Sequence, residues 1–287
     1  MGSIPLVNAE WQVWLTTNTQ RGCSPASMME AMIKAGFDPA AALAMVQSAG
    51  RPSNIGTQAM ATAIAPSAYH YDAAPVARGN LIHAGDREIK VLLRCERPQV
   101  LVFGEVLTPD ECTEMIERSR HRLQRSTTIN PSTGQQDVIP NRTSAGVWFQ
   151  RGEDAFIDRL EQRIASLMNW PLEHGEGLQV MHYQTSGEYR PHFDYFPPEQ
   201  TGSAVHTASG GQRVATLIMY LNDVPDGGET IFPDAGISVV PRQGGAVYFR
   251  YLNGSRQLDP LTLHGGAPVL SGEKWIMTKW VREHPYV

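Results

Sequence analysis

The chain has 287 residues, of which 41% are hydrophobic and 8% aromatic, and its formal net charge is −5. This length suits one large domain or two modest ones, and the apolar content excludes a disordered or fibrous chain. An acidic balance without a dense Lys/Arg tract argues against a nucleic-acid partner. No apolar run approaches the roughly 18 residues that cross a bilayer, and the first residues lack a secretory signal pattern, so we expect no membrane association.

The cysteine pattern indicates a reducing environment. Cys23, Cys95 and Cys112 are widely separated, and an odd number cannot be fully paired within one chain. Their spacing matches no zinc-site pattern. We therefore expect a cytoplasmic protein with packed, unpaired thiols.

The first part of the chain predicts short helices followed by a linker. Ser24-Pro25 and Asp38-Pro39 each combine a helix N-cap with a proline at the first helical position. A third helix is expected near residues 8–17. Residues 50–85 lose periodicity, so we place a helical N-terminal region with its linker at 1–85 and a second domain at 86–287. The methionine-rich stripe of this region predicts either packing against the linker or the second domain, or a recognition or dimerisation surface.

The second domain is expected to be mainly β-structure supported by helices. Thr108-Pro109-Asp110-Glu111 has the pattern of a capping box, and apolar residues at helical spacing predict another helix over 156–168. Short strands are expected at 89–93, 100–103, 178–183, 214–221, 246–249 and 275–280. Many short strands after a few helices predict an α+β fold with a β-sandwich or barrel.

A His-x-Asp pair, His192 and Asp194, is the first candidate for chemistry. In an extended segment, residues two apart project to the same side, so both side chains can bind one metal ion. His264, in Leu261-Thr-Leu-His264-Gly-Gly, is the best candidate for a third ligand. Two imidazoles and one carboxylate that leave open positions form the ligand set of an oxygen-activating ferrous site. Taken alone, such a pair is more often a turn-forming aspartate beside a packed histidine.

Lys274 interrupts an otherwise apolar strand ten residues after His264. A lysine in a strand is usually exposed to solvent, but inside a barrel it needs an anionic partner. A dicarboxylate co-substrate supplies such a partner. The turn Asp226-Gly-Gly-Glu-Thr230 brings a hydroxyl group that can bind the same carboxylate, although a plain hairpin turn explains the two glycines equally well.

These motifs together resemble the catalytic domain of the prolyl 4-hydroxylase family. The resemblance spans residue 98 to the C-terminus, about two thirds of the chain, and rests on several motifs in the family's order. They are Tyr183 and Tyr189 before His192-Phe-Asp194, Arg213-Val-Ala-Thr-Leu-Ile-Met-Tyr-Leu221, Gly227-Gly-Glu-Thr230, His264, and Gly272-Glu-Lys274-Trp275 followed by Trp280.

The resemblance implies a double-stranded β-helix (jelly-roll) core and a set of residue roles. His192, Asp194 and His264 match the iron ligands, and Lys274, Thr230 and Tyr183 match the groups that hold the distal carboxylate of 2-oxoglutarate. The positions that match the family's substrate groove are Tyr189, Arg213, Trp280 and Glu176. Ferrous iron, 2-oxoglutarate and dioxygen are the implied cofactor and co-substrates, with ascorbate as a reductant.

The implied reaction is hydroxylation of an unactivated C–H bond, and three interpretations of the protein remain. The first is hydroxylation of a prolyl residue in a peptide or protein, for which an extended proline-containing strand against aromatic side chains is suitable. The second is the same chemistry on a free amino acid or another small molecule. The third is a binding module or sensor that keeps the fold without turnover.

Overall fold

The computed structural model describes residues 11, 15, 25–34, 37–49, 69–129, 135–137 and 142–286. The chain forms two compact units, Met1–Pro66 and Ser67–Val287. The division after residue 66 lies earlier in the chain than the boundary near residue 85 that the composition suggested. The segment just before residue 85 therefore belongs to the larger unit.

The small unit contains the two expected helices, α2 (Pro25–Lys34) and α3 (Pro39–Ala49), and each begins at its predicted proline. The region expected to form a third helix lies mostly outside the described residues. The methionine stripe packs inside the unit, since a separate apolar cluster contains its buried members. The buried residues of this cluster are Leu15, Met28, Met32, Phe37, Ala42 and Val46.

The larger unit is built from short strands with a few helices, as the sequence predicted. Its helices are α4 (Pro109–Arg120), α5 (Ala155–Met168), α6 (Ser203–Thr207), η1 (Leu172–His174) and η2 (Pro260–Thr262). Its strands are β1 (Leu81–Ala84), β2 (Arg87–Glu96), β3 (Gln99–Gly104), β4 (Gln124–Arg125), β5 (Thr128–Ile129), β6 (Gln136–Asp137), β7 (Ala145–Phe149), β8 (Leu178–Tyr183), β9 (Tyr189–His192), β10 (Arg213–Tyr220), β11 (Asp226–Gly227), β12 (Thr230–Phe232), β13 (Ile237–Val239), β14 (Ala246–Arg250), β15 (His264–Gly266), β16 (Val269–Ser271) and β17 (Lys274–Arg282).

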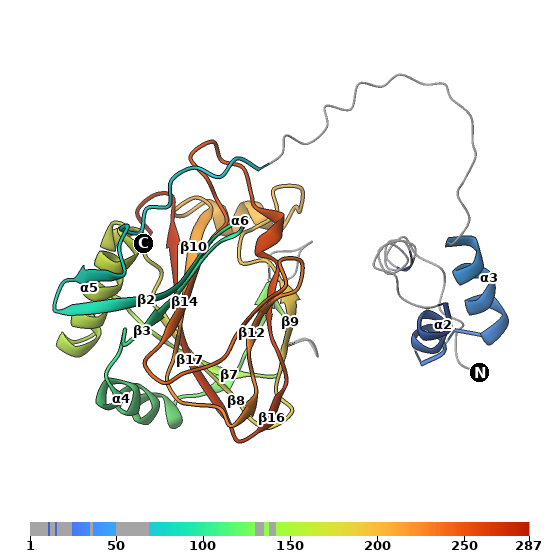
Figure 1. Ribbon diagram of the computed structural model, residues 1–287, viewed down its shortest axis with the longest axis horizontal. Coiled ribbons are helices and arrows are strands. Elements are labelled where there is room, and N and C mark those ends of the chain that lie inside the picture. The colour runs from blue at the N-terminus through green and yellow to red at the C-terminus, as the bar shows by residue number, and fades with distance from the viewer. Residues whose placement is uncertain are drawn as a thin grey trace. The chain divides into compact units, whose positions relative to one another are not determined.

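Two antiparallel sheets face each other and form the expected jelly roll (Figure 1). The large sheet has the strand order β1-β2-β3-β14-β10-β17-β8-β7-β4, and the small sheet has the order β13-β12-β15-β9. Strands that are adjacent in a sheet are therefore often distant in the sequence. This topology brings β9, β10, β15 and β17 around one interior space.

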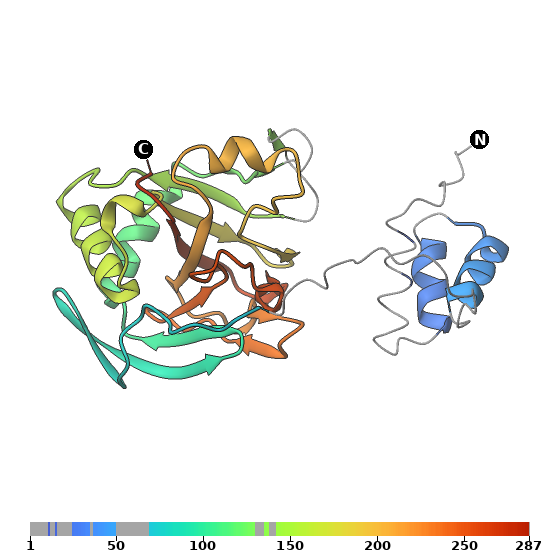
Figure 2. The ribbon, with the colours of Figure 1, turned by 90° about the horizontal axis from the view of Figure 1, so that it is seen from above.

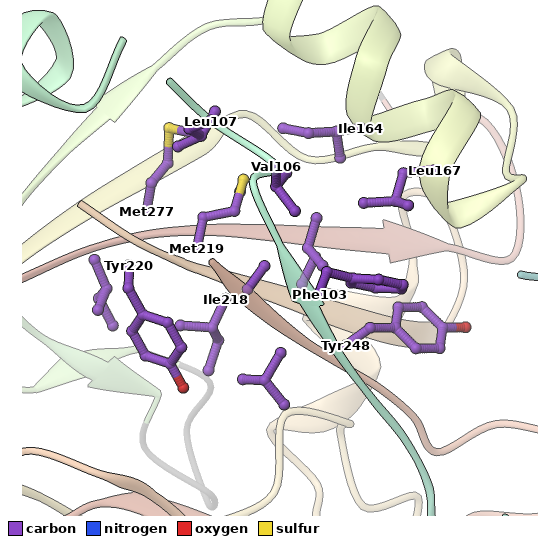
Figure 3. Close-up of a cluster of buried hydrophobic side chains, with 14 of the residues drawn as sticks. Phe103, Val106, Leu107, Ile164, Leu167, Ile218, Met219, Tyr220, Tyr248 and Met277 are labelled. Carbon is purple, nitrogen blue, oxygen red and sulfur yellow. The ribbon is translucent and has the colours of Figure 1, made fainter. Parts of the chain in front are cut away.

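Helices α4 and α5 lie beside each other on the outer side of the large sheet (Figure 2). The predicted capping box of α4 is present, because Thr108 Oγ1 accepts from the Glu111 amide and the Glu111 carboxylate accepts from the Thr108 amide. Ile164 and Leu167 of α5 project toward the strands and pack with Phe103 in the main core (Figure 3). The helices thus seal one face of the sheet and leave its other face for the interior space.

Strand alternation determines which side chains reach that space. In β10, Met219 lies on the helix side, whereas Ile218 and Tyr220 lie on the opposite side (Figure 3). Successive side chains of a strand point to opposite faces, so every second residue of the three central strands shares the inner face. Of these, the ones that line the cavity are Gln179, Met181 and Tyr183 in β8, Ile218 in β10, and Lys274, Ile276, Thr278 and Trp280 in β17.

Cys95 is half-buried and Cys112 is buried, and both thiols are free. Cys23 lies outside the described residues. None of the helices that the structure describes combines the length and the hydropathy required to cross a bilayer.

Residues 69–76, here called the strap, are bonded to the jelly roll. The Asp72 carboxylate accepts from Arg250 Nη1 at 2.6 Å and Nη2 at 3.2 Å, and it also accepts from the Gly254 amide at 2.8 Å. Asn253 Nδ2 donates to the His70 carbonyl at 2.8 Å. The strap therefore fixes the loop that follows β14 and leads toward His264.

We expect Asp72→Asn to lower the free energy of unfolding of the full chain by about 1–2 kcal/mol, because the buried Arg250 guanidinium loses its carboxylate. Chemical denaturation of the full chain measures this change. Arg94→Gln is the matched control, because the partners of Arg94 among the described residues are the carbonyls of Ala77 and Gly79, beyond the strap. Equal stability of Asp72→Asn and the wild type would show that the strap adds no stability.

Candidate active site

Three potential metal ligands, His192, Asp194 and His264, meet in the interior space. One ligand atom from each lies within 4.8 Å of the others. His192 ends β9 and His264 begins β15, and the two residues are direct partners in the antiparallel register of these strands. Asp194 follows two residues after His192. The predicted same-side projection of the His-x-Asp pair is thus confirmed.

Backbone carbonyls orient both imidazole rings. His192 Nδ1 lies 2.9 Å from the Arg190 carbonyl oxygen, and His264 Nδ1 lies 3.0 Å from the Thr262 carbonyl oxygen. A carbonyl can only accept, so each Nδ1 carries a hydrogen, and in the neutral form of each ring Nε2 presents a lone pair. The Nε2 atoms of His192 and His264 lie 3.6 Å and 3.5 Å from the oxygens of Asp194. A hydrogen bond from the second ring nitrogen to a backbone carbonyl is typical of metal-binding histidines.

Asp194 is buried, and its charged form is well supported. Burial raises its pKa, but His264 and His192 outweigh this effect and hold the pKa of Asp194 well below its usual range. Thr216 Oγ1 donates to Asp194 Oδ2 at 2.7 Å, and the Tyr251 hydroxyl lies 3.2 Å from the same Thr216 oxygen. Burial lowers the pKa of His264 to about 4, so its ring is neutral near pH 7.

This donor set fits a divalent transition metal. Two imidazoles and one carboxylate on one side leave further coordination positions open toward the cavity. Such a facial arrangement is typical of ferrous oxygenases, whereas a structural zinc site has four protein ligands. A bound cation also offsets the cost of burying the Asp194 carboxylate.

Lys274 provides an unpaired positive charge in the same cavity. Its side chain is buried, and among the described residues its ammonium group makes neither a hydrogen bond nor an ion pair. Burial lowers its pKa to about 8, against the opposing effect of Glu229. Lys274 Nζ lies 5.7 Å from the centre of the Tyr183 ring, and Thr230 lines the cavity as well. The structure thus brings together the three residues expected at one end of a co-substrate.

Three of the four residues expected in a substrate groove line the cavity. Tyr189 stacks on His192 with ring centres 3.7 Å apart. Arg213 lies over the Trp280 ring, with its Cζ atom 4.3 Å from the ring centre. Both Arg213 and Trp280 face the space beside Asp194.

The fourth residue, Glu176, lies behind the cavity wall rather than on it. Its carboxylate accepts from Arg213 at 2.6 and 2.9 Å and from Arg282 Nε at 2.7 Å. Burial raises the pKa of Glu176, but these two guanidinium groups outweigh it and keep the pKa low. Glu176 therefore holds Arg213 in place and does not itself reach the cavity, which corrects the expectation of a direct substrate contact.

Arg142, Trp148 and Thr216 are cavity or ligand-holding residues that the sequence did not single out. Arg142 is buried, stacks over the Tyr189 ring at 4.8 Å and donates to the Thr127 carbonyl at 2.8 Å. Trp148 is 42% exposed at the rim. Arg142 and Trp148 lie outside the motifs that carry the resemblance, and Thr216 lies inside one but had no assigned role. Their spacing relative to the ligands offered no further signal.

We expect Thr216→Val to weaken binding of Co(II) about tenfold, because Asp194 loses the donor that fixes its carboxylate. Anaerobic titration of the full chain with Co(II) measures the affinity, and thermal denaturation of the metal-free protein checks that the fold is retained. Thr216→Ser keeps the hydroxyl and should restore binding. Wild-type affinity in Thr216→Val would show that this hydrogen bond does not position the ligand.

Comparisons with known proteins match this geometry. A model of the 2OG-Fe(II) oxygenase superfamily matches residues 178–282, which include the three clustered ligands. Probable prolyl 4-hydroxylase 10 of Arabidopsis thaliana is 38% identical over 238 residues, covering 75% of this chain and 81% of that protein. Prolyl 4-hydroxylase 1 of the same plant is 40% identical over 201 residues, covering 65% and 69%.

A solved structure agrees with these sequence relatives. The crystal structure of a viral collagen prolyl hydroxylase from Paramecium Bursaria Chlorella virus-1, in complex with 2-oxoglutarate, superposes with a TM-score of 0.50 at 27% identity. It covers 64% of this chain and 95% of the viral chain. The chain therefore belongs to the prolyl 4-hydroxylase family of 2-oxoglutarate- and iron(II)-dependent oxygenases.

Proposed function

We propose that this enzyme hydroxylates prolyl residues within a peptide or protein. The observation that carries the proposal is a single cavity of about 560 Å³ that contains the metal ligands, the unpaired Lys274 and an aromatic wall. The sequence relatives named above are prolyl 4-hydroxylases, which supports the same substrate class.

Separate groups of cavity residues would bind the cofactor and the co-substrate. His192, Asp194 and His264 would hold ferrous iron, and the Lys274 ammonium and Thr230 hydroxyl would hold the distal carboxylate of 2-oxoglutarate. With dioxygen, the bound iron and keto acid supply the oxidising chemistry that converts 2-oxoglutarate to succinate and carbon dioxide while a substrate C–H bond becomes C–OH.

The protein's part in this reaction is to position the substrate and exclude water. Tyr189 and Trp280 place aromatic side chains on the cavity wall near the metal ligands, where they can contact a pyrrolidine ring. Trp148 lies at the rim of the cavity, and the centre of its ring is 5.7 Å from that of Trp280. A peptide segment can continue outside the cavity at this rim. Arg142 has no carboxylate partner among the described residues. Its guanidinium donates to Ser144, Thr127, Gln179 and Met181, which leaves one Nη1 hydrogen for a backbone carbonyl of the substrate.

Arg142 also favours a second candidate, a free amino acid. A guanidinium without a carboxylate partner can bind an α-carboxylate as well as a peptide carbonyl. A peptide substrate would extend to the rim and contact the half-exposed Trp148, whereas a free amino acid would not reach it. The two candidates therefore differ in their dependence on Trp148.

We expect purified enzyme with ferrous iron, 2-oxoglutarate and ascorbate to add one oxygen atom to proline in proline-containing peptides. Mass spectrometry with fragmentation locates the added oxygen, and His192→Ala is the inactive control. Trp148→Ala should raise KM for the peptide severalfold. Oxidation of free proline alone, unaffected by Trp148→Ala, would contradict the peptide proposal and favour the second candidate.

Affinity for 2-oxoglutarate is expected to fall as the pH rises above about 8. Only the ammonium form of Lys274 attracts the carboxylate, and its pKa of about 8 in the protein without co-substrate means that this form is lost as the pH rises. The Kd should then rise by up to about tenfold per pH unit. Equilibrium binding to the Mn(II)-loaded protein from about pH 7 to pH 9 measures this dependence. Lys274→Arg, whose guanidinium keeps its charge, should show a flat profile, and a flat wild-type profile would contradict the assignment.

We also propose that ascorbate keeps the iron reduced and that the enzyme works in a reducing compartment such as the cytoplasm. Two free thiols, Cys95 and Cys112, are compatible with such a compartment.

A further inference from the structure

Tyr220, at the end of β10, makes a hydrogen bond that joins the two sheets of the jelly roll. Its side chain is 1% exposed, and its hydroxyl donates to Thr230 Oγ1 in β12 at 2.8 Å. Among the described residues, Thr230 is its one hydrogen-bond partner. Tyr220 does not line the cavity, so any influence on a ligand must pass through Thr230.

Thr230 lies close to the charged end of Lys274. It is the register partner of Gly266 in β15, and a Cβ atom added at Gly266 would lie 3.7 Å from Lys274 Nζ. Thr230 and Lys274 both line the cavity. A hydroxyl from β12 and an ammonium group from β17, strands of the two facing sheets, therefore converge on one end of the space.

The hydrogen bond from Tyr220 determines where the hydrogen of Thr230 can point. The Tyr220 hydroxyl donates to Thr230 Oγ1, and burial raises the pKa of Tyr220, so the phenol keeps this hydrogen. A threonine hydroxyl has one hydrogen of its own, and it cannot point that hydrogen at a donor. No acceptor for it exists among the described residues, so the hydrogen is left for a ligand in the cavity. Hydrogen bonds in such a chain strengthen one another in a low-dielectric site.

We propose that Tyr220 is a positioning residue for the distal carboxylate of 2-oxoglutarate, because it directs the Thr230 hydroxyl hydrogen into the cavity. This inference rests on the proposed binding of that carboxylate by Lys274 and Thr230. The relay of hydrogen bonds from Tyr220 through Thr230 to the carboxylate strengthens the binding of a ligand that carries an acceptor at this end. Tyr220 thus contributes to the choice of a dicarboxylate over a keto acid with an apolar end.

The test compares two ligands that differ only at the distal end. The ligands are 2-oxoglutarate and 2-oxopentanoate, which has a methyl group in place of the distal carboxylate. Binding to the Mn(II)-loaded full chain is measured without oxygen, so turnover plays no part. We expect Tyr220→Phe to raise the Kd of 2-oxoglutarate about three- to tenfold, the effect of one hydrogen bond, and to leave the Kd of 2-oxopentanoate unchanged.

A double-mutant cycle separates the relay from general loosening of the core. Thr230→Val should weaken 2-oxoglutarate binding, and adding Tyr220→Phe to it should cause no further loss. Tyr248→Phe is the matched control, because Tyr248 is equally buried in neighbouring β14 but has no bond to Thr230. It should bind both ligands like the wild type.

Three results would overturn the relay alone: an unchanged Kd in Tyr220→Phe, equal weakening of both ligands, or additive losses in the double variant. If the wild type itself binds 2-oxoglutarate no more tightly than 2-oxopentanoate, the carboxylate site of Lys274 and Thr230 is wrong. The relay then fails together with that part of the proposed function.

Discussion

The burial of one carboxylate, Asp194, is the constraint on which the site depends. An ionised carboxylate inside a β-sandwich is costly unless it is paired and hydrogen-bonded. Here Thr216 donates to one of its oxygens, and the Nε2 atoms of two imidazoles face it at 3.5 and 3.6 Å, across a space that a divalent cation would occupy. Hydrogen bonds from Nδ1 to backbone carbonyls orient both histidine rings, so that their Nε2 atoms point at the same space. The polypeptide thereby provides a negative, preoriented site that a divalent cation completes.

Strand alternation supplies the rest of the cavity from distant parts of the chain. Periodicity predicted the central strands to within a few residues, and their alternation explains why Lys274 and Trp280 share a face. It did not predict which face, because β17 is buried along its whole length and carries lysines on both sides. Lys274 points into the cavity, whereas Lys279 pairs with Glu161 of α5 on the other face. Only the family motifs distinguished the two lysines in the sequence.

Contacts between residues far apart in the chain explain what the sequence did not reveal. The motifs predicted the metal ligands and the cavity positions of Tyr183, Thr230 and Tyr189, because each lies at a fixed position in a strand or turn. Glu176 was expected to touch substrate, but it is held by Arg213 of β10 and Arg282 of β17. The strap was expected to be linker, and its place in the larger unit depends on Arg250, which is 178 residues from Asp72. Such pairings have no local pattern.

The most direct test of the account is an anaerobic titration of the full chain with ferrous iron in the presence of 2-oxoglutarate. A ferrous ion chelated by a keto acid gives a visible charge-transfer absorption, so metal and co-substrate are detected together. We expect saturation at one equivalent of iron for the wild type and for His174→Ala, which alters a histidine outside the cluster, and loss of the absorption in His264→Ala. An unchanged absorption in His264→Ala, or its absence in the wild type, would contradict the assigned iron site.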